Sequence, residues 1–178
     1  MLDACRSKRD DRPSVAVPKP ANVHMVMPEH ALSLLALIQE SDRELEITTR
    51  DYGKIREVID LATDRAPLAE ADGSPFMRPV FGIIVVDGTV EGACGLFPTQ
   101  PWDSWETYLR GFFFFVSNAA RQKNHGKSLL QWSNWFSDRA RMTLVWEVFN
   151  CSLLDDRSRM FMRHGSPLGA LFIRRPVA

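Results

Sequence analysis

The sequence predicts a single α/β domain, and three observations indicate this class. Segments with helical and strand-like hydrophobic patterns alternate along most of the chain. The pair Asp87-Gly88 between two apolar runs predicts a tight hairpin. The stretch from Gly111 to Trp135 begins as a buried strand, passes through a basic turn and ends with helical spacing. At 178 residues the chain is long enough to bury one substantial core.

The N-terminal part predicts a tail, a strand and a helix. Residues 1–21 carry many charges and prolines and few large apolar groups, so we expect a flexible or partner-bound tail before a single domain over 22–178. The run Val23–Met27 has the composition of a short strand. A helix is predicted after Pro28. Its expected apolar face consists of Leu32, Leu34, Leu35, Leu37 and Ile38.

A second helix is predicted after an ambiguous polar segment at Asp42–Ile47. It begins near Thr49, with Arg50 or Asp51 in its first turn. Its expected apolar face consists of Tyr52, Ile55, Val58, Ile59 and Ala62. The proline-rich segment 66–79 that follows is a surface loop, which either contributes to substrate binding or simply connects two elements.

The middle of the chain predicts a hairpin over residues 80–97, in which Gly92 and Gly95 mark a bulge or a close backbone approach. A long strand then runs over Trp105–Val116, and a helix over Asn124–Arg141. The C-terminal part predicts three further elements in the order strand, helix, strand. These are Met142–Phe149, Asn150–His164 and Leu168–Ile173.

Charge and cysteine content exclude several function classes. Lys plus Arg and Asp plus Glu both total 22, so no net charge attracts the chain to nucleic acid or to an anionic membrane. No apolar run reaches the roughly 18 residues of a membrane span, and we expect a cytoplasmic protein. The three cysteines, Cys5, Cys94 and Cys151, are widely separated, which favours reduced thiols and gives no metal-binding pattern. Cys94 and Cys151 could act as nucleophiles, but neither has a neighbouring His in sequence, and buried roles are more frequent for such residues.

The strand, turn and helix between Gly111 and Trp135 have the physical features of an anion site. The first N–H groups of a helix have no partner within the helix, and this end of the helix dipole is positive. A glycine in the turn lets the backbone approach a phosphate closely. We therefore expect the ligand of this protein to bind at this turn.

The same turn carries a resemblance to a known family. Residues 116–130 read VSNAARQKNHGKSLL, and this segment resembles the pyrophosphate-binding motif of the GNAT N-acyltransferases, Arg/Gln-x-x-Gly-x-Gly/Ala. Arg121 takes the first position, Asn124 replaces the first glycine, and Gly126 is the second. Asn is the residue that best tolerates the left-handed conformation in place of glycine. The resemblance implies a divergent member with a mixed, mostly antiparallel central sheet flanked by about four helices.

The resemblance also implies a coenzyme A site. Backbone N–H groups of the turn would hold the diphosphate, and the end of the strand would pair with the pantetheine arm. The implied cofactor-binding residues are Val116, Asn118, Arg121, Gln122, Lys123, Asn124, His125, Gly126 and Lys127. The basic side chains among them suit a nucleotide 3′-phosphate, or form a solvated basic turn. His125 either contacts phosphate or faces solvent.

Acylation of an amine requires a base, and the sequence offers few carboxylates for this role. Glu147 is the preferred choice and Glu106 the second, with Glu91 on the hairpin also available. The alternative for Glu147 is a charge on an exposed strand face. The run Met160–Gly165 resembles the family's Leu-Tyr-x-x-x-Gly, in which the Tyr commonly protonates the leaving thiolate. Phe161 stands at that position and has no proton to donate.

These observations predict an acyl-CoA-dependent N-acyltransferase that passes an acetyl or similar group directly to an amine in a ternary complex, with acetyl-CoA as cosubstrate and no metal. The alternative is a GNAT-fold protein with a degenerate active site that serves as a structural or interaction component, for example in a phage virion. A third reading is an acyl-CoA sensor without turnover. The tail and exposed aromatics would offer contacts to a second copy or to an assembly partner.

Overall fold

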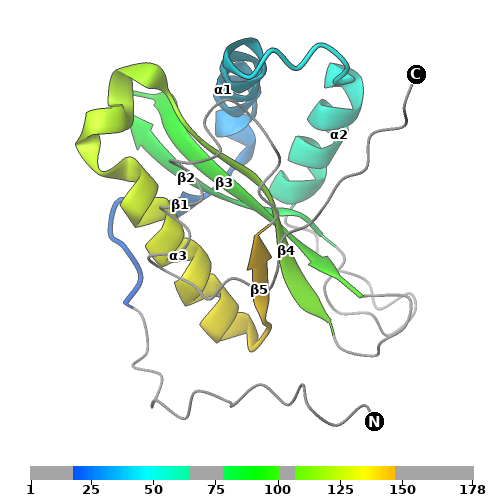
Figure 1. Ribbon diagram of the computed structural model, residues 1–178, viewed down its shortest axis with the longest axis vertical. Coiled ribbons are helices and arrows are strands. Elements are labelled where there is room, and N and C mark those ends of the chain that lie inside the picture. The colour runs from blue at the N-terminus through cyan, green and yellow to red at the C-terminus, as the bar shows by residue number, and fades with distance from the viewer. Residues whose placement is uncertain (1–17, 65–77, 101–106, 147–178) are drawn as a thin grey trace, which may run out of the picture.

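The computed structural model describes residues 18–64, 78–100 and 107–146, which form a five-stranded sheet with helices on both faces (Figure 1). The strands lie in the order in which they occur along the chain. They are β1 (His24–Met25), β2 (Val80–Val86), β3 (Thr89–Thr99), β4 (Tyr108–Val116) and β5 (Leu144–Trp146). Neighbouring strands are antiparallel except β4 and β5, which are parallel. The mixed, mostly antiparallel sheet is therefore confirmed.

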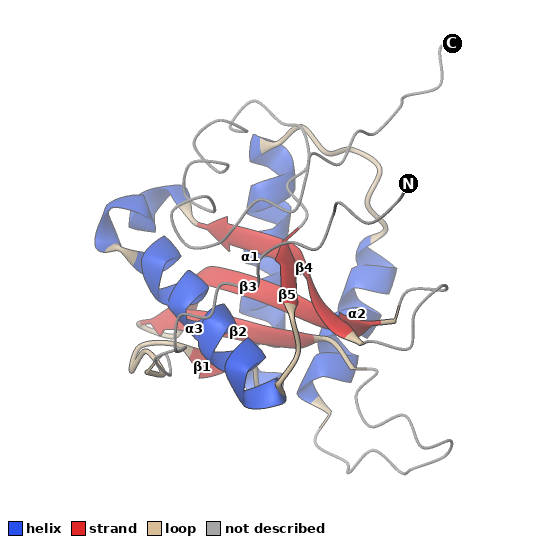
Figure 2. Cartoon of the chain, turned by 60° about the horizontal axis from the view of Figure 1, so that its bottom comes forward, coloured by secondary structure: helices blue, strands red, loops and turns tan. Residues whose placement is uncertain are grey.

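Helices cover the two faces of the sheet unequally, as Figure 2 shows. The helical elements are η1 (Pro28–His30), α1 (Ala31–Glu44), α2 (Tyr52–Thr63), η2 (Asn118–Lys123) and α3 (His125–Ala140). α1 and α2 pack on one face, where Leu34, Ile59 and Phe115 belong to one apolar cluster. α3 packs on the other face, where Leu129 and Trp132 belong to a second cluster. The sheet thus separates two apolar layers.

The hairpin between β2 and β3 is confirmed. Asp87 and Gly88 both have positive φ, 48° and 78°, which is the backbone of a type I′ turn. This turn has the twist that antiparallel neighbours require, so a local sequence signal determines the pairing of two long strands.

A bulge in β4 explains the run of four phenylalanines. Gly95 of β3 pairs with Phe113, while the next residue, Leu96, pairs with Gly111, so Phe112 is the extra residue. Phe112 therefore packs with Phe113 on the side of α1 and α2. Without the bulge, strict alternation would place these two rings on opposite faces. The predicted close approach at Gly95 is confirmed, because a Cβ there would lie 2.7 Å from the Phe112 ring.

A second glycine allows α3 to approach the sheet closely. A Cβ on Gly82 of β2 would lie 2.5 Å from the indole of Trp132. Trp132 is fully buried, and its ring stacks on Phe136 at a centroid distance of 5.3 Å. The predicted helix over Asn124–Arg141 is therefore confirmed to within one residue at each end.

The two N-terminal helices differ from the prediction in detail. α1 continues through Glu44 into the segment that had no clear pattern. Its buried residues follow the spacing of Leu34, Leu37 and Ile38, which leaves Leu32 on the opposite side of the helix and 71% exposed; its predicted place on the apolar face was wrong. α2 is capped by Asp51, whose side chain accepts hydrogen bonds from two first-turn N–H groups.

The apolar face of α2 is narrower than predicted. Ile59 is fully buried and Ile55 packs beside it, whereas Tyr52 and Val58 are 37% and 36% exposed. Tyr52 and Val58 therefore lie at the edge of the apolar face, partly exposed, and not within it as predicted.

The start of the described chain contacts α3. Asn22 Nδ2 donates to Ser128 Oγ at 3.2 Å, and Lys19 Nζ lies 5.5 Å from the ring centroid of Trp135. Several predictions lie outside the described residues and stay predictions. They are most of the tail, most of the loop 66–79, the strand start before 107, the C-terminal helix and strand, and the candidate bases Glu106 and Glu147.

Candidate functional site

A turn connects β4 to α3 at the position that the sequence predicted. After β4 the chain makes the short helix η2 and reaches Asn124 in the left-handed conformation, with φ 59° and ψ 15°. α3 then begins at His125, and no side chain caps this start in the described structure. The N–H groups of a helix's first turn have no partner within the helix, so those after Asn124 are available to a ligand.

A bulge in β3 brings Glu91 to this turn. Ile84 of β2 pairs with Gly92, while its neighbour Val85 pairs with Val90, so Glu91 is the extra residue. Its carbonyl accepts a hydrogen bond from the Ser117 N–H at 2.8 Å, directly after β4. The bulge therefore joins β3 to the start of the turn through the backbone.

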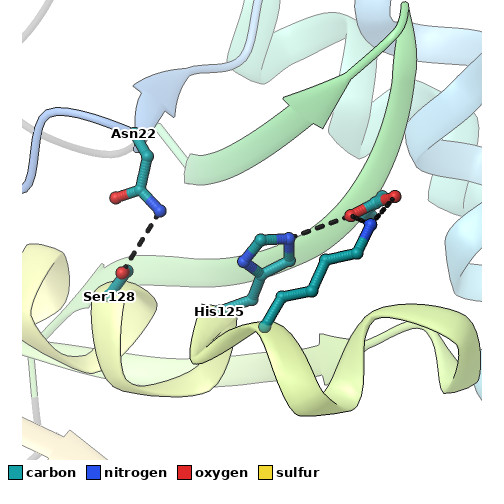
Figure 3. Close-up of polar contacts among 5 residues, drawn as sticks. Asn22, His125 and Ser128 are labelled. Carbon is teal, nitrogen blue, oxygen red and sulfur yellow. Dashed lines mark hydrogen bonds and ion pairs between the residues drawn. The ribbon is translucent and has the colours of Figure 1, made fainter.

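The carboxylate of Glu91 contacts both residues that flank Asn124 (Figure 3). Lys123 Nζ donates to its two oxygens at 2.8 and 3.0 Å. His125 Nε2 lies 2.9 Å from Oε2, and because an ionised carboxylate can only accept, the imidazole donates from Nε2. The hydrogen bonds from Lys123 and then from His125 hold the pKa of Glu91 below its ordinary value, against the opposing effect of burial.

Two further carboxylates reach the turn from α1. Glu40 Oε1 accepts from the backbone N–H of Asn118 at 3.0 Å. Glu44 forms an ion pair with Arg121, whose guanidinium also lies 5.8 Å from the ring centroid of Phe115. The C-terminal half of α1 thus binds the first part of the turn, and Glu91 binds the second.

The predicted coenzyme residues lie together along this segment. Most are exposed, Val116 and Gly126 are half-buried, and His125 is buried. Of the three cations predicted to form one cluster, Arg121 and Lys123 each have a carboxylate partner, while Lys127 has no ion pair to any described residue. His125 does not face solvent, because only 7% of it is exposed.

A second polar cluster fixes the corner between α1 and α2. Asp42 is buried and forms an ion pair with Arg50 at 2.9 Å, and Tyr52 donates its hydroxyl to the same carboxylate at 3.2 Å. Burial and then the bond to Asp42 raise the pKa of Tyr52. This arrangement orders the segment between the helices and leaves Asp42 compensated in the interior.

Cys94 has no nucleophilic role in this arrangement. It is fully buried, and burial raises the pKa of its thiol, so the reactive thiolate is strongly disfavoured. Among residues 18–64, 78–100 and 107–146, no group of three or more His, Cys, Asp or Glu side chains is arranged to hold a metal ion. Within the same part of the chain, the helices lack the length and apolar character required to span a bilayer.

Sequence reasoning missed the part that glutamates play around the turn. Glu40 and Glu44 lie on one side of α1 at a spacing of four residues, but no local signal relates them to a turn more than 70 positions away. Glu91 was considered only as a base. The adjacent Gly92 was a usable signal, because it predicted an irregular ladder at this point.

Solved structures of low sequence identity share this architecture, whereas no protein-family model and no curated protein sequence matches the chain. A ribosomal-protein-alanine N-acetyltransferase from Brucella melitensis biovar Abortus 2308 aligns over 86% of this chain and 96% of its own, with 15% identity and a TM-score of 0.61. The chain has a GNAT-type acetyltransferase fold. An aminoglycoside acetyltransferase from an uncultured soil metagenomic sample, solved with sisomicin, aligns over 88% and 93% at 11% identity with a TM-score of 0.58.

An integron cassette protein from the mobile metagenome of Cole Harbour Salt Marsh aligns over 88% of this chain and 91% of its own, at 15% identity and a TM-score of 0.62. The GNAT-type fold is therefore found with very different sequences. At these identities the similarity concerns the arrangement of strands and helices, and function has to be argued from the turn itself.

Proposed function

We propose that this protein is an acyl-CoA-dependent N-acyltransferase that transfers an acetyl or similar group directly to an amine in a ternary complex. The observation that carries the proposal is the turn after β4, where Asn124 adopts the left-handed conformation and α3 begins without a side-chain cap. Known acetyltransferases with the same arrangement of elements support it.

The residues of the turn fit a diphosphate in conformation and in polarity. The left-handed residue turns the chain so that successive N–H groups after it can point to one side, and such groups bind phosphate oxygens. Asn124 supplies this conformation in place of glycine. Gln122 and Lys123 lie within η2, so the N–H groups of His125, Gly126 and Lys127 at the start of α3 would hold the diphosphate, and Lys127 would add a cation. Bound acetyl-CoA would supply the activated acyl group, and the residues of the turn would hold it in place.

Glu91 is poorly suited to be the base that deprotonates the amine. A general base works best with a pKa near the operating pH, and the hydrogen bonds from Lys123 and His125 lower the pKa of Glu91. Its oxygens are also engaged by Lys123 and His125. We therefore propose Glu147, then Glu106, as the base. Because Phe161 has no acidic proton, another donor or water would protonate the departing thiolate.

Binding of coenzyme A measured by isothermal titration calorimetry tests the first half of the proposal. We expect saturable binding of acetyl-CoA and coenzyme A by the wild type and its loss in Gly126→Trp, which adds a large side chain at the start of α3. Leu61→Trp is the matched control, because Leu61 is 42% exposed on α2, outside the turn. Absence of binding at millimolar coenzyme would refute the proposal.

Turnover is tested separately with a thiol-detection assay on a panel of primary amines. Release of coenzyme A that depends on the amine supports an acyltransferase, and mass spectrometry of the acceptor identifies the transferred group. Binding without thiol release with any amine would indicate a sensor, and absence of both would favour the non-catalytic structural or interaction protein.

A further inference from the structure

Glu91 connects the sheet to the turn through both its backbone and its side chain. Its place in the β3 bulge removes it from the regular alternation of side chains. Its carbonyl accepts from the Ser117 N–H, and its side chain reaches Lys123 and His125. One residue thus contacts the turn at its beginning and on both sides of the left-handed residue.

His125 depends on Glu91 for its orientation. His125 is the first residue of α3, and it is buried with 7% of its surface exposed. Its Nδ1 has no hydrogen-bond partner among the described residues, so the bond from Nε2 to Glu91 is the polar contact that fixes the ring there. In Figure 3 the dashed line from the labelled His125 ring, which marks its bond to Glu91, leads away from the pair formed by Asn22 and Ser128.

From these contacts we propose that Glu91 is a positioning residue for the coenzyme. Its carboxylate holds Lys123 and His125 and so keeps Asn124 in the conformation that presents the first N–H groups of α3 to the diphosphate. The inference rests on the proposed coenzyme site. It assigns a role to a strand residue that would not itself touch the coenzyme.

A competing role for Glu91 predicts the opposite effect on coenzyme binding. Glu91 could act as an internal counter-anion that occupies Lys123 until a phosphate displaces it. The bond to the buried His125 favours positioning, because a counter-anion for Lys123 has no need of a second hydrogen bond from an imidazole. Removing the charge of Glu91 distinguishes the two roles. If Glu91 is a counter-anion, its removal strengthens phosphate binding. If Glu91 is a positioning residue, its removal weakens phosphate binding.

The experiment measures the Kd of coenzyme A by calorimetry for the full chain and for Glu91→Gln, His125→Ala and the double variant. Glu57→Gln, an exposed glutamate on α2, is the control for the lost negative charge. We expect Glu91→Gln and His125→Ala each to raise the Kd about tenfold, the size of effect typical of one lost bond to a charged group. The loss of affinity in the double variant should be smaller than the sum of the two single losses, because both single variants remove the bond between Glu91 and His125. Glu91→Asp, which keeps the charge on a shorter side chain, should recover part of the affinity.

Tighter binding by Glu91→Gln would overturn the proposal in favour of the counter-anion. An unchanged Kd with a lowered melting temperature would overturn it in favour of a purely structural role, and additive losses would show that Glu91 does not act through His125. Amide hydrogen exchange of the same variants supplies a readout that does not need the coenzyme. Faster exchange confined to residues 117–128 in Glu91→Gln supports the proposal, and unchanged exchange there overturns it.

The two proposals can fail separately. If the wild type binds neither coenzyme A nor acetyl-CoA, the proposed function fails. The exchange rates then still decide whether Glu91 holds the turn. If the wild type binds and Glu91→Gln binds equally well, the proposed function stands and the positioning role fails.

Discussion

The left-handed conformation of Asn124 predicts an unusual order of stability between alanine and glycine. At φ 59° a residue with a Cβ is strained by about 1–2 kcal/mol. Glycine has no such strain but loses more conformational freedom on folding, by about 0.5–1 kcal/mol. We therefore expect Asn124→Gly to be more stable than Asn124→Ala by about 0.5–1 kcal/mol.

The same pair of substitutions at an ordinary helical position is the control. Glu57 lies exposed within α2, where alanine is favoured over glycine by about 1 kcal/mol. The sign of the alanine–glycine difference should therefore reverse between the two positions. Urea unfolding gives each free energy of unfolding, and a difference of 1 kcal/mol corresponds to about 2–4 °C in melting temperature for a chain of this size.

The coenzyme should respond to Asn124 in the same order. If the alanine variant leaves the left-handed conformation in part of the population, its Kd for coenzyme A rises by up to about fivefold for 1 kcal/mol, while the glycine variant stays close to wild type. An alanine variant that is as stable as the glycine variant would refute the argument, because it would show that the turn does not need the left-handed conformation.

Three further predictions follow from the described packing and charges. Arg141 ends α3 in the left-handed conformation, so Arg141→Gly should be more stable than Arg141→Ala by about 0.5–1 kcal/mol in urea unfolding; equal stability would contradict the proposed strain. Gly82→Ala places a Cβ 2.5 Å from the Trp132 ring. Alanine also stiffens the unfolded chain, which is stabilising, but the net effect should still be a free energy of unfolding lower by about 1–2 kcal/mol. An unchanged free energy of unfolding would mean that the ring can move aside. The pKa of Glu91 in the folded protein lies below its ordinary value, so the ionised carboxylate stabilises the fold above the ordinary glutamate pKa, and this contribution is lost as pH falls through the folded pKa. The free energies of unfolding of wild type and Glu91→Gln should therefore differ at pH 7 and approach each other as pH falls below the ordinary glutamate pKa in urea titrations; a difference that stays constant with pH would contradict this.

Elements defined by short-range signals could be predicted from the sequence. The Asp87-Gly88 turn fixes the pairing of β2 and β3, and the apolar spacing of Leu129, Leu130 and Trp132 fixes α3. Both depend on neighbours within a few residues, so the chain alone carries the information. The resemblance at the turn gave the GNAT-type fold for the same reason, since a strand, a turn and a helix are contiguous in sequence.

The bulges could not be located from the sequence alone. Gly92 and Gly95 predicted irregular pairing, but the extra residues are Glu91 and Phe112, and their identity depends on the register of the partner strand. A shift by one residue changes which side chains face α1 and which face α3. The register also determines whether Glu91 points to the turn, so its contacts with Lys123 and His125 depend on strand register.

Two of the three cationic side chains of the turn are paired with carboxylates. Arg121 and Lys123 suggested a surplus of cations for a phosphate, yet each is paired with a carboxylate, from Glu44 and from Glu91. An anion that reaches the turn therefore meets backbone N–H groups and Lys127 more than free cationic side chains. Recognition by the backbone depends on conformation and tolerates a change of side chain. This explains how Asn124 can stand where glycine is usual, provided that neighbouring carboxylates hold the turn in shape.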